Sequence, residues 1–296
     1  MRETKMEEAI NLIFNHKPSA IYTLWQAFRS RKSRFTSEEE VPVIHASRSS
    51  LGINERHLRD FYEICHIRPL PSLHILYPFT LCYPYMMRIL CRREMPFSLF
   101  KVLNTRTSIT MFRAIRPDER IDIDCHNAPV RIISKGLEVD IVSEVRAGRE
   151  KVWQNITIYF LRGRFGQGEK SHTPLRLAPI VDAPVIKEWY LPAKDRFRFA
   201  RVSGDTNGLH YGAFYARMQG FKRDFAQPIR IVAECVSSLP NIRMARPLQL
   251  DFFLKGPVYY ESMLVLKHKK MKNSDRFDLY CRGNTKPCIS GELCRI

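Results

Sequence analysis

One arrangement occurs twice along this chain, and it restricts the possible folds more than any other feature of the sequence. A helical segment that begins with proline, at Pro84 and again at Pro228, is followed by segments in which apolar and polar residues alternate. The second copy is offset by 140 residues, which carries Pro117 onto Pro257. This repeated element order predicts two copies of one unit, each an antiparallel sheet wrapped around a helix.

The alternation begins at about Val102 and has the two-residue period of half-buried strands. Its apolar positions in the first copy are Ile109, Met111, Ile121, Ile123, Leu137, Val139, Ile141, Ile156, Ile158 and Phe160. In the second copy, IRIVAECVSSL has apolar residues at helical spacing after Pro228, and Pro240 ends that helix. The strand segments LQLDFFL, MLVLKH and RFDLYC follow. Together these patterns predict an α+β protein.

Shifts in composition divide the chain into four segments. Residues 1–40 contain the amphipathic stretches MEEAINLIF and IYTLWQAF and are predicted to form a helical extension packed on the outside. Residues 164–185 are rich in Gly and Pro and lose the alternation, which is typical of a linker. This linker separates a first half, residues 41–163, from a second half, residues 186–296.

The formal net charge of +18 favours anionic partners, although charge alone does not identify them. The two densest basic runs, residues 29–34 and 267–272, lack the regular aromatic residues of a single-strand binding platform. We interpret both runs as solvated surfaces. Association with nucleic acid or with an anionic membrane surface rests on charge only and ranks last among the hypotheses.

Two further features bear on the compartment. Residues 69–87 contain no charged side chain of Asp, Glu, Lys or Arg, but four prolines and His74 favour a buried loop and central helix over a membrane span. The eight cysteines form no CxxC pair, and the start of the chain shows no signal-peptide core. We therefore expect reduced thiols in a cytoplasmic protein.

The candidate chemistry lies in residues 199–229, FARVSGDTNGLHYGAFYARMQGFKRDFAQPI. Asp205 and His210 place a carboxylate and an imidazole on one short turn, where both can transfer protons on the same side of a substrate. The alternative is that Asp205 only caps a following helix.

This segment resembles the signature of the MaoC-like hydratase/dehydratase family, in which Ser-Gly-Asp-x-Asn-Pro-(aliphatic)-His is followed by Ala, Gly-Phe and Ala-His-Gly-Met. The matching residues are Phe199, Ser203, Gly204, Asp205, Asn207, Leu209, His210, Ala216, Gly220, Phe221 and Ala226. The resemblance implies a hot-dog fold and, with the internal repeat, a double hot-dog. The first half has no matching Asp and His, and it resembles the family's degenerate partner, which makes room for a long acyl tail.

The resemblance also implies an activity, that of a (3R)-hydroxyacyl-thioester dehydratase or trans-2-enoyl-thioester hydratase in fatty-acid metabolism. Its substrate is expected on coenzyme A or acyl carrier protein, with no separate cofactor. His210 is expected to act on the water or hydroxyl oxygen and Asp205 on the C2 proton, while Ser203, Gly204 and Asn207 support the turn. A homodimer or a complex with a partner subunit is also expected.

The chain departs from the family pattern at two places. Gly208 replaces a proline, which permits a looser turn before His210. More importantly, Pro228 replaces the glycine whose N–H donates to the thioester carbonyl in the family, and proline has no N–H. Loss of one such donor typically lowers the rate by about 10²–10³. Either the Ile229 N–H or the Gln227 side-chain amide could replace it; otherwise the protein is an impaired thioester-binding or scaffold subunit.

Basic residues beside the motif are candidates for contacts to the phosphates of coenzyme A or to an acidic carrier surface. They are Arg198, Arg201, Lys222, Arg223 and Arg230. No metal site is expected, because the adjacent Cys125 and His126 have no second Cys/His cluster nearby at ligand spacing.

Overall fold

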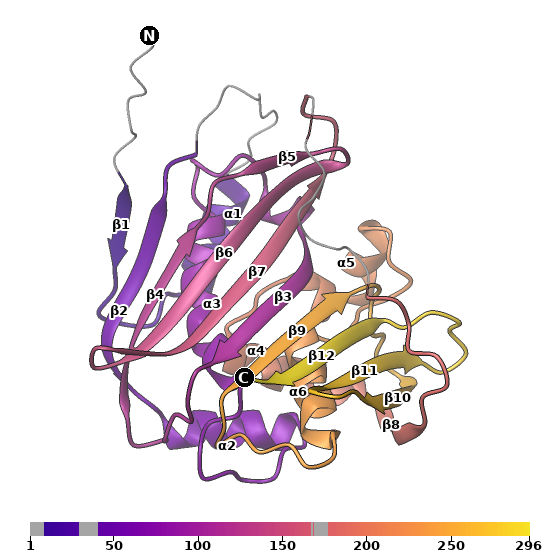
Figure 1. Ribbon diagram of the computed structural model, residues 1–296. Helices are drawn as coiled ribbons and strands as arrows, with labels where there is room; N and C mark the ends of the chain where they lie inside the picture. The colour runs from indigo at the N-terminus through magenta and orange to yellow at the C-terminus, as the bar shows by residue number, and fades with distance from the viewer. Residues whose placement is uncertain (1–8, 30–40, 167, 169–176) are drawn as a thin grey trace.

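The computed structural model describes residues 9–29, 41–166, 168 and 177–296 (Figure 1). These residues form a single twelve-stranded sheet in the order β1-β2-β4-β6-β7-β3-β9-β12-β11-β10-β8, with β5 paired to β6 outside this path. The strands before residue 164 are β1 (Ile10–Ile13), β2 (Ile44–Gly52), β3 (Leu103–Met111), β4 (Arg120–Asn127), β5 (Arg131–Ile133), β6 (Gly136–Ala147) and β7 (Glu150–Arg162). The later strands are β8 (Val185–Leu191), β9 (Leu248–Leu254), β10 (Ser262–Lys270), β11 (Ser274–Cys281) and β12 (Ile289–Arg295).

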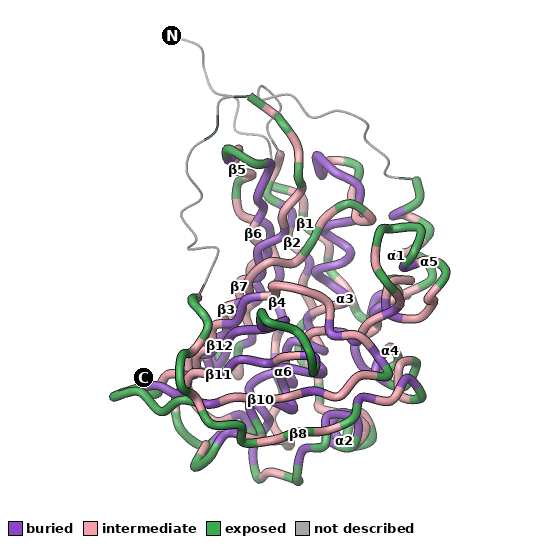
Figure 2. Tube along the Cα trace, turned by 90° about the vertical axis from the view of Figure 1, so that its right-hand side faces the viewer, coloured by how far each residue is buried: buried purple, intermediate pink, exposed green. Residues whose placement is uncertain are grey.

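The helices gather on one face of this sheet, behind the strands in Figure 1. The α-helices are α1 (Ala20–Arg29), α2 (Glu55–Ile64), α3 (Tyr77–Leu90), α4 (Arg196–Ser203), α5 (Ala213–Met218) and α6 (Pro228–Ser238). Three short 3₁₀ turns complete the described elements: η1 (Leu99–Lys101), η2 (Ala193–Asp195) and η3 (Gly208–His210). Helix α3 packs on β2, β4 and β6, so it is the central helix of the first half. Helix α6 is buried in the second half, and both helices belong to the purple interior of Figure 2.

The two halves share one sheet and one core because β3 pairs with β9. This antiparallel pairing sets Thr107 opposite Phe252, and the Arg106 guanidinium binds the Asp251 carboxylate at 2.6 Å on the same strand pair. The repeat predicted from the sequence therefore becomes two similar units joined edge to edge. The exact segment boundaries predicted above stay predictions.

The uncharged window of residues 69–87 becomes a buried loop and the central helix α3, as predicted. The start of this helix differs, since α3 begins at Tyr77 and keeps Pro84 in its interior. Pro78 lies in the first turn, where a residue without an N–H removes no intrahelical hydrogen bond. Over the described part of the chain, every helix is too short or too polar to cross a membrane.

Of the two helical stretches predicted in the N-terminal segment, one is a strand in part and the other is a helix. Ile10–Ile13, within the stretch MEEAINLIF, is a strand rather than a helix, because its backbone pairs in parallel with the edge of β2, beginning with Ile10 N–H to Val43 O at 2.9 Å. Residues 6–8 lie outside the described residues. The stretch IYTLWQAF is helical and belongs to α1, whereas most of the basic run at residues 29–34 lies outside the described residues.

Strand β7 presents the opposite face from the one expected. Trp153 and Tyr159 belong to the core, whereas Ile156 and Ile158 lie on the other face of the sheet. The register explains this inversion, since Tyr159 pairs with the core residue Val139 of β6. Strands β2, β8 and β12, which the alternation did not predict, also belong to the twelve-stranded sheet.

Candidate active site

The turn that carries Asp205 begins where helix α4 ends. Gly204 caps α4 in the left-handed conformation, with φ of 74°, and its N–H donates to Ala200 O at 2.7 Å. Glycine suits this position because it carries no Cβ to clash. The Ser203 hydroxyl donates to Phe199 O at 2.9 Å and accepts from the Asp205 N–H at 3.2 Å. Ser203 and Gly204 thus fix the direction in which the chain leaves the helix.

Two side chains then shape the turn between Asp205 and His210. Asp205 Oδ1 accepts the Asn207 N–H at 2.8 Å, and Asn207 Oδ1 accepts the Leu209 N–H at 3.2 Å. Such local bonds are typical of Asx turns. Asn207 caps the turn η3, whose last residue is His210. Asn207 therefore occupies the supporting position that the sequence predicts.

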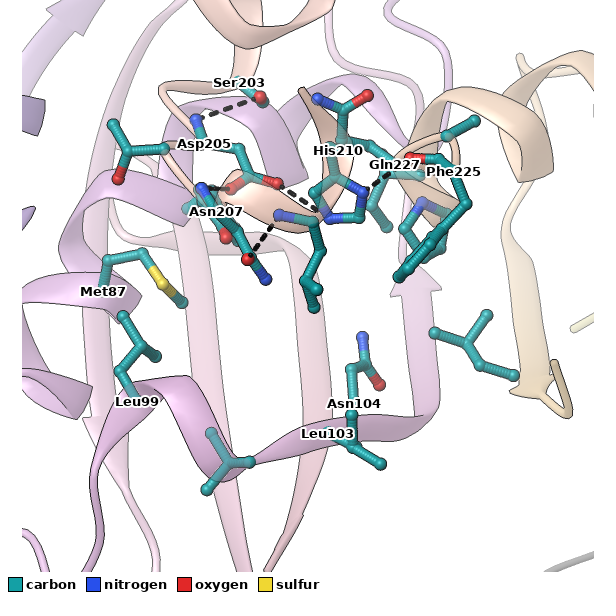
Figure 3. Close-up of a pocket in the computed structure, with 18 of the residues that line it drawn as sticks. Met87, Leu99, Leu103, Asn104, Ser203, Asp205, Asn207, His210, Phe225 and Gln227 are labelled. Atoms are coloured by element: carbon teal, nitrogen blue, oxygen red, sulfur yellow. Dashed lines mark hydrogen bonds and ion pairs between the residues drawn. The ribbon is translucent and has the colours of Figure 1, made fainter. Parts of the chain in front are cut away.

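Asp205 and His210 face each other, with His210 Nε2 3.5 Å from Asp205 Oδ2 (Figure 3). Both side chains are only 8% exposed. His210 Nδ1 lies 2.9 Å from Phe225 O, and because a carbonyl oxygen only accepts, Nδ1 must carry a hydrogen. Nε2 is then the nitrogen that gains or loses a proton, and it points at the carboxylate.

A cavity of about 430 Å³ opens beside this pair. Its wall combines both halves of the chain, and in Figure 3 Met87, Leu99 and Leu103 lie across from Asp205 and His210. Its size is within the usual range for a small-molecule pocket, and most of its lining is apolar. Helix α1 also contributes, through Ala20 and Leu24, so the N-terminal segment forms part of the wall.

Three tyrosines lie near enough to Asp205 to be influenced by its charge. Burial first, and then the charge of Asp205, raises the pKa of Tyr83, Tyr159 and Tyr211. All three hydroxyls therefore stay protonated at neutral pH and can donate hydrogen bonds. The Tyr211 hydroxyl donates to the backbone carbonyl of Asp205.

The N-terminus of α6 forms the part of the cavity wall next to the pair. Pro228 is the first residue of the helix, and Gln227, Pro228 and Ile229 all line the cavity. Gln227 Nε2 donates to the Tyr211 hydroxyl at 2.9 Å. Because Pro228 has no N–H, the first backbone donor of the helix is that of Ile229.

The basic residues predicted to meet a phosphate or carrier differ in their surroundings. Arg201 and Lys222 are exposed, Arg198 pairs with Glu63 at 2.9 Å, and Arg223 pairs with Asp224 at 3.4 Å. The prediction that Arg230 contacts a phosphate or a carrier was wrong, because its side chain is 0% exposed. It points into the protein from α6, 3.6 Å from Asp195, and cannot meet a carrier surface.

The sequence predicted that the first half makes room for the substrate, but it did not identify the residues that do so. Tyr83, Met87, Asn104 and Tyr159 line the cavity, yet each stands alone in its own segment with no motif around it. Tyr211 follows His210 directly but is not part of the family signature. No signal in a single sequence would have selected these residues.

No family model matches the sequence. The chain is 23% identical over 243 residues to 3-hydroxyacyl-thioester dehydratase X of Mycobacterium tuberculosis, covering 79% of this chain and 86% of that protein. The crystal structure of this mycobacterial protein, HtdX, covers 85% of this chain and all of its own, with a TM-score of 0.72 and 19% identity.

Two more solved structures have similar folds. A MaoC-like dehydratase from Phytophthora capsici gives a TM-score of 0.72 at 17% identity, over 86% of this chain and 95% of its own. A second Mycobacterium tuberculosis protein, described as a double hotdog fold, gives 0.56 at 10% identity over 90% and 96% of the two chains. The predicted α+β double hot-dog fold and the resemblance to MaoC-like dehydratases are confirmed, and the expected hydro-lyase class agrees with the names of these relatives.

Proposed function

We propose that this double hot-dog protein, similar in sequence and fold to MaoC-like dehydratases, interconverts (3R)-3-hydroxyacyl thioesters and trans-2-enoyl thioesters. One observation carries the proposal. A buried imidazole and a buried carboxylate, His210 Nε2 and Asp205 Oδ2, lie 3.5 Å apart at the wall of an apolar cavity.

The pair has the two groups that this reaction needs. During dehydration, the Asp205 carboxylate takes the proton from C2, and protonated His210 gives its Nε2 proton to the hydroxyl at C3. The C3–O bond breaks, water leaves, and the C2–C3 double bond forms. Hydration reverses each step: neutral His210 takes a proton from water as its oxygen bonds to C3, and protonated Asp205 delivers a proton to C2.

The cavity supports an acyl chain as the substrate. Phe79, Met87, Leu99 and Leu103 line its wall from the first half, which has no acid/base pair of its own. We infer that the tail extends toward these residues and that the substrate has a medium or long chain. The net charge of +18 agrees with coenzyme A or an acidic acyl carrier protein as the carrier. No separate cofactor is needed for this chemistry.

The proposed site has fewer backbone donors than usual for stabilising the thioester oxygen. Negative charge builds on this oxygen as the C2 proton is removed, and a helix N-terminus with free N–H groups normally stabilises it. In this chain Pro228 offers no N–H at the first position of α6. We propose that the Ile229 N–H takes part of this role, so the reaction proceeds with reduced oxyanion stabilisation.

A chain-length series of trans-2-enoyl-CoA and enoyl-carrier substrates tests the activity. We expect purified protein to hydrate medium or long chains fastest and Asp205→Asn and His210→Ala to lose this rate. His66→Ala, a half-exposed histidine outside the cavity lining, is the control that keeps it. Equal rates for the wild type and both site variants at every chain length would refute the proposal.

A second candidate function is that of a non-catalytic acyl-thioester-binding subunit, and Pro228 is the observation that favours it. The two functions separate when binding and turnover are measured on the same protein. Binding of a saturated acyl-CoA, which cannot be hydrated, combined with no turnover in either the wild type or Pro228→Gly would favour the binding subunit.

A further inference from the structure

A second cluster of chemistry-bearing side chains lies on the opposite face of the sheet from the helices. It consists of His45 on β2 and of Asp124 and His126 on β4. Their chain neighbours Ile44 and Cys125 point into the core, so the three side chains point outward. The register sets His45 directly opposite His126, which brings Asp124 onto the same face two residues away.

The three side chains converge on a small volume. His45 Nδ1 and His126 Nδ1 lie 3.2 and 3.3 Å from the same oxygen, Asp124 Oδ1. One ligand atom from each residue lies within 4.8 Å of the other two. Bonds of about 2.0–2.1 Å at tetrahedral angles put neighbouring ligand atoms about 3.3 Å apart. Both measured distances therefore match the edges of a tetrahedral coordination sphere.

Hydrogen bonding explains this arrangement less well than metal coordination does. A charge-assisted bond from an imidazole to a carboxylate is typically about 2.7–2.9 Å long, shorter than both contacts. Both imidazoles also aim at Oδ1, although a carboxylate offers two oxygens, and only His45 has a second contact, at 3.4 Å to Oδ2. The imidazole rings lie side by side with centroids 5.1 Å apart, so two protonated rings would repel each other.

We propose that His45, Asp124 and His126 form a binding site for a divalent first-row transition metal ion, with zinc as its most typical occupant. Two imidazole nitrogens and one carboxylate oxygen are the donors that zinc, cobalt, nickel and copper accept, whereas magnesium and calcium prefer oxygen donors alone.

Solvent completes the coordination. The three side chains are 35%, 42% and 29% exposed, which leaves the metal open on the outer side. Glu144 lies opposite Asp124 on β6, but Lys151 and Gln154 donate to its Oε1 at 3.1 and 3.0 Å. Water is therefore the fourth ligand in this geometry.

The bound ion cross-links β2 to β4 near the edge of the sheet. His45 and Asp124 are 79 residues apart in the chain, so the ion joins distant segments and favours the folded state. The ligands point away from the cavity, and the dehydration chemistry does not pass through them. The metal site is thus independent of the proposed function.

Binding of Zn²⁺ and Co²⁺ to the chelator-treated full chain tests this site, by calorimetry for Zn²⁺ and by visible absorption for Co²⁺. We expect one equivalent to bind and to raise the melting temperature. His45→Ala and His126→Ala are each expected to weaken binding at least about tenfold, since even changes in residues behind metal ligands have effects of that size. His66→Ala is the matched control and keeps full binding.

Three results would overturn the proposal. The first is the same affinity in His45→Ala/His126→Ala as in the wild type, and the second is equal loss in His66→Ala. The third is the intense charge-transfer absorption of cobalt bound to thiolates, which would place the ion on cysteines. If an alanine variant does not fold, Asp124→Asn and His126→Gln preserve side-chain size and answer the same question, with circular dichroism to check folding.

Discussion

The N-termini of the two central helices occupy equivalent places in the two halves, yet only that of α6 lies beside the proposed acid/base pair. Before α6, residues 204–227 supply Asp205, His210 and helix α5. Before α3, the shorter segment of residues 65–76 has no carboxylate. The first half does contain a histidine there, His74, but it is completely buried.

The surroundings of the two histidines explain the difference. His74 Nδ1 accepts the Leu76 N–H at 3.2 Å, and its Nε2 lies 3.2 Å from the Ser237 hydroxyl. Burial lowers the pKa of His74 to about 3, so it is a neutral structural residue. His210 instead has a carboxylate partner and lines a cavity. The two halves therefore differ in the longer loop and its carboxylate. His210 has Asp205 beside it and lines a cavity, whereas His74 is completely buried.

The largest effect is expected at the acid/base pair itself. Asp205→Asn and His210→Ala should each lower kcat/KM by about 10²–10⁴, the usual contribution of general acid–base catalysis. The double variant should be no slower than the slower single variant, because the two groups act as one unit. Steady-state hydration rates of all three variants measure this. Losses that multiply in the double variant would mean that the residues act independently.

The next effect concerns the helix N-terminus. Pro228→Gly restores a backbone N–H at the first position of α6, which lines the cavity, and should raise kcat, with about 10²–10³ as the upper limit for one donor. Pro78→Ala, in the first turn of α3, is the matched change in the first half and should leave kcat unchanged. Initial rates with a single enoyl-CoA measure both. An unchanged rate in Pro228→Gly would show that the missing donor limits nothing.

The free energy of unfolding at acidic pH should depend on the buried His74. The pKa of His74 is about 3 in the folded protein and about 6.5 in the unfolded chain. Only the unfolded chain therefore binds this proton between these values, and the free energy of unfolding falls as pH drops from 6.5 toward 3. A single group contributes about 1.4 kcal/mol per pH unit at most.

His74→Gln should flatten this decline, as measured by urea unfolding at several pH values from 7 to 4. His16→Ala, a change at an exposed histidine, serves as the control. If the free energy of unfolding falls with pH equally steeply in His74→Gln and in the wild type, the structural role of His74 is contradicted.

The smallest effect is expected when the two capping asparagines, Asn207 and Asn54, are replaced. Asn207 caps η3 beside His210, and Asn54 caps α2 by accepting the His57 N–H at 2.9 Å. Replacing either residue by alanine should lower the free energy of unfolding by about 1 kcal/mol. Only Asn207→Ala should also lower kcat, because only that turn positions Asp205 and His210. Thermal unfolding together with kinetics checks this, and an equal fall in kcat for Asn54→Ala would remove the distinction.

Short-range patterns in the sequence predicted a substantial part of this protein. The alternation of apolar residues indicated most of the strands, the repeat indicated two units, and the resemblance of residues 199–229 to the MaoC-like signature indicated Asp205 and His210 as the pair. These features involve residues close together in the chain, where backbone geometry restricts side-chain positions before any tertiary contact forms. The motif and the turn bonds around Asn207 belong to the same category.

Tertiary structure decided the rest, because pairing and register bring distant residues together. The register of β7 put Tyr159 rather than Ile158 toward the core, and the edge of β2 made Ile10–Ile13 a strand. Arg230 is buried only because α6 is enclosed on all sides. His45 meets Asp124 across 79 residues. A local pattern cannot specify such contacts, since a shift of one residue in strand pairing turns every side chain to the other face.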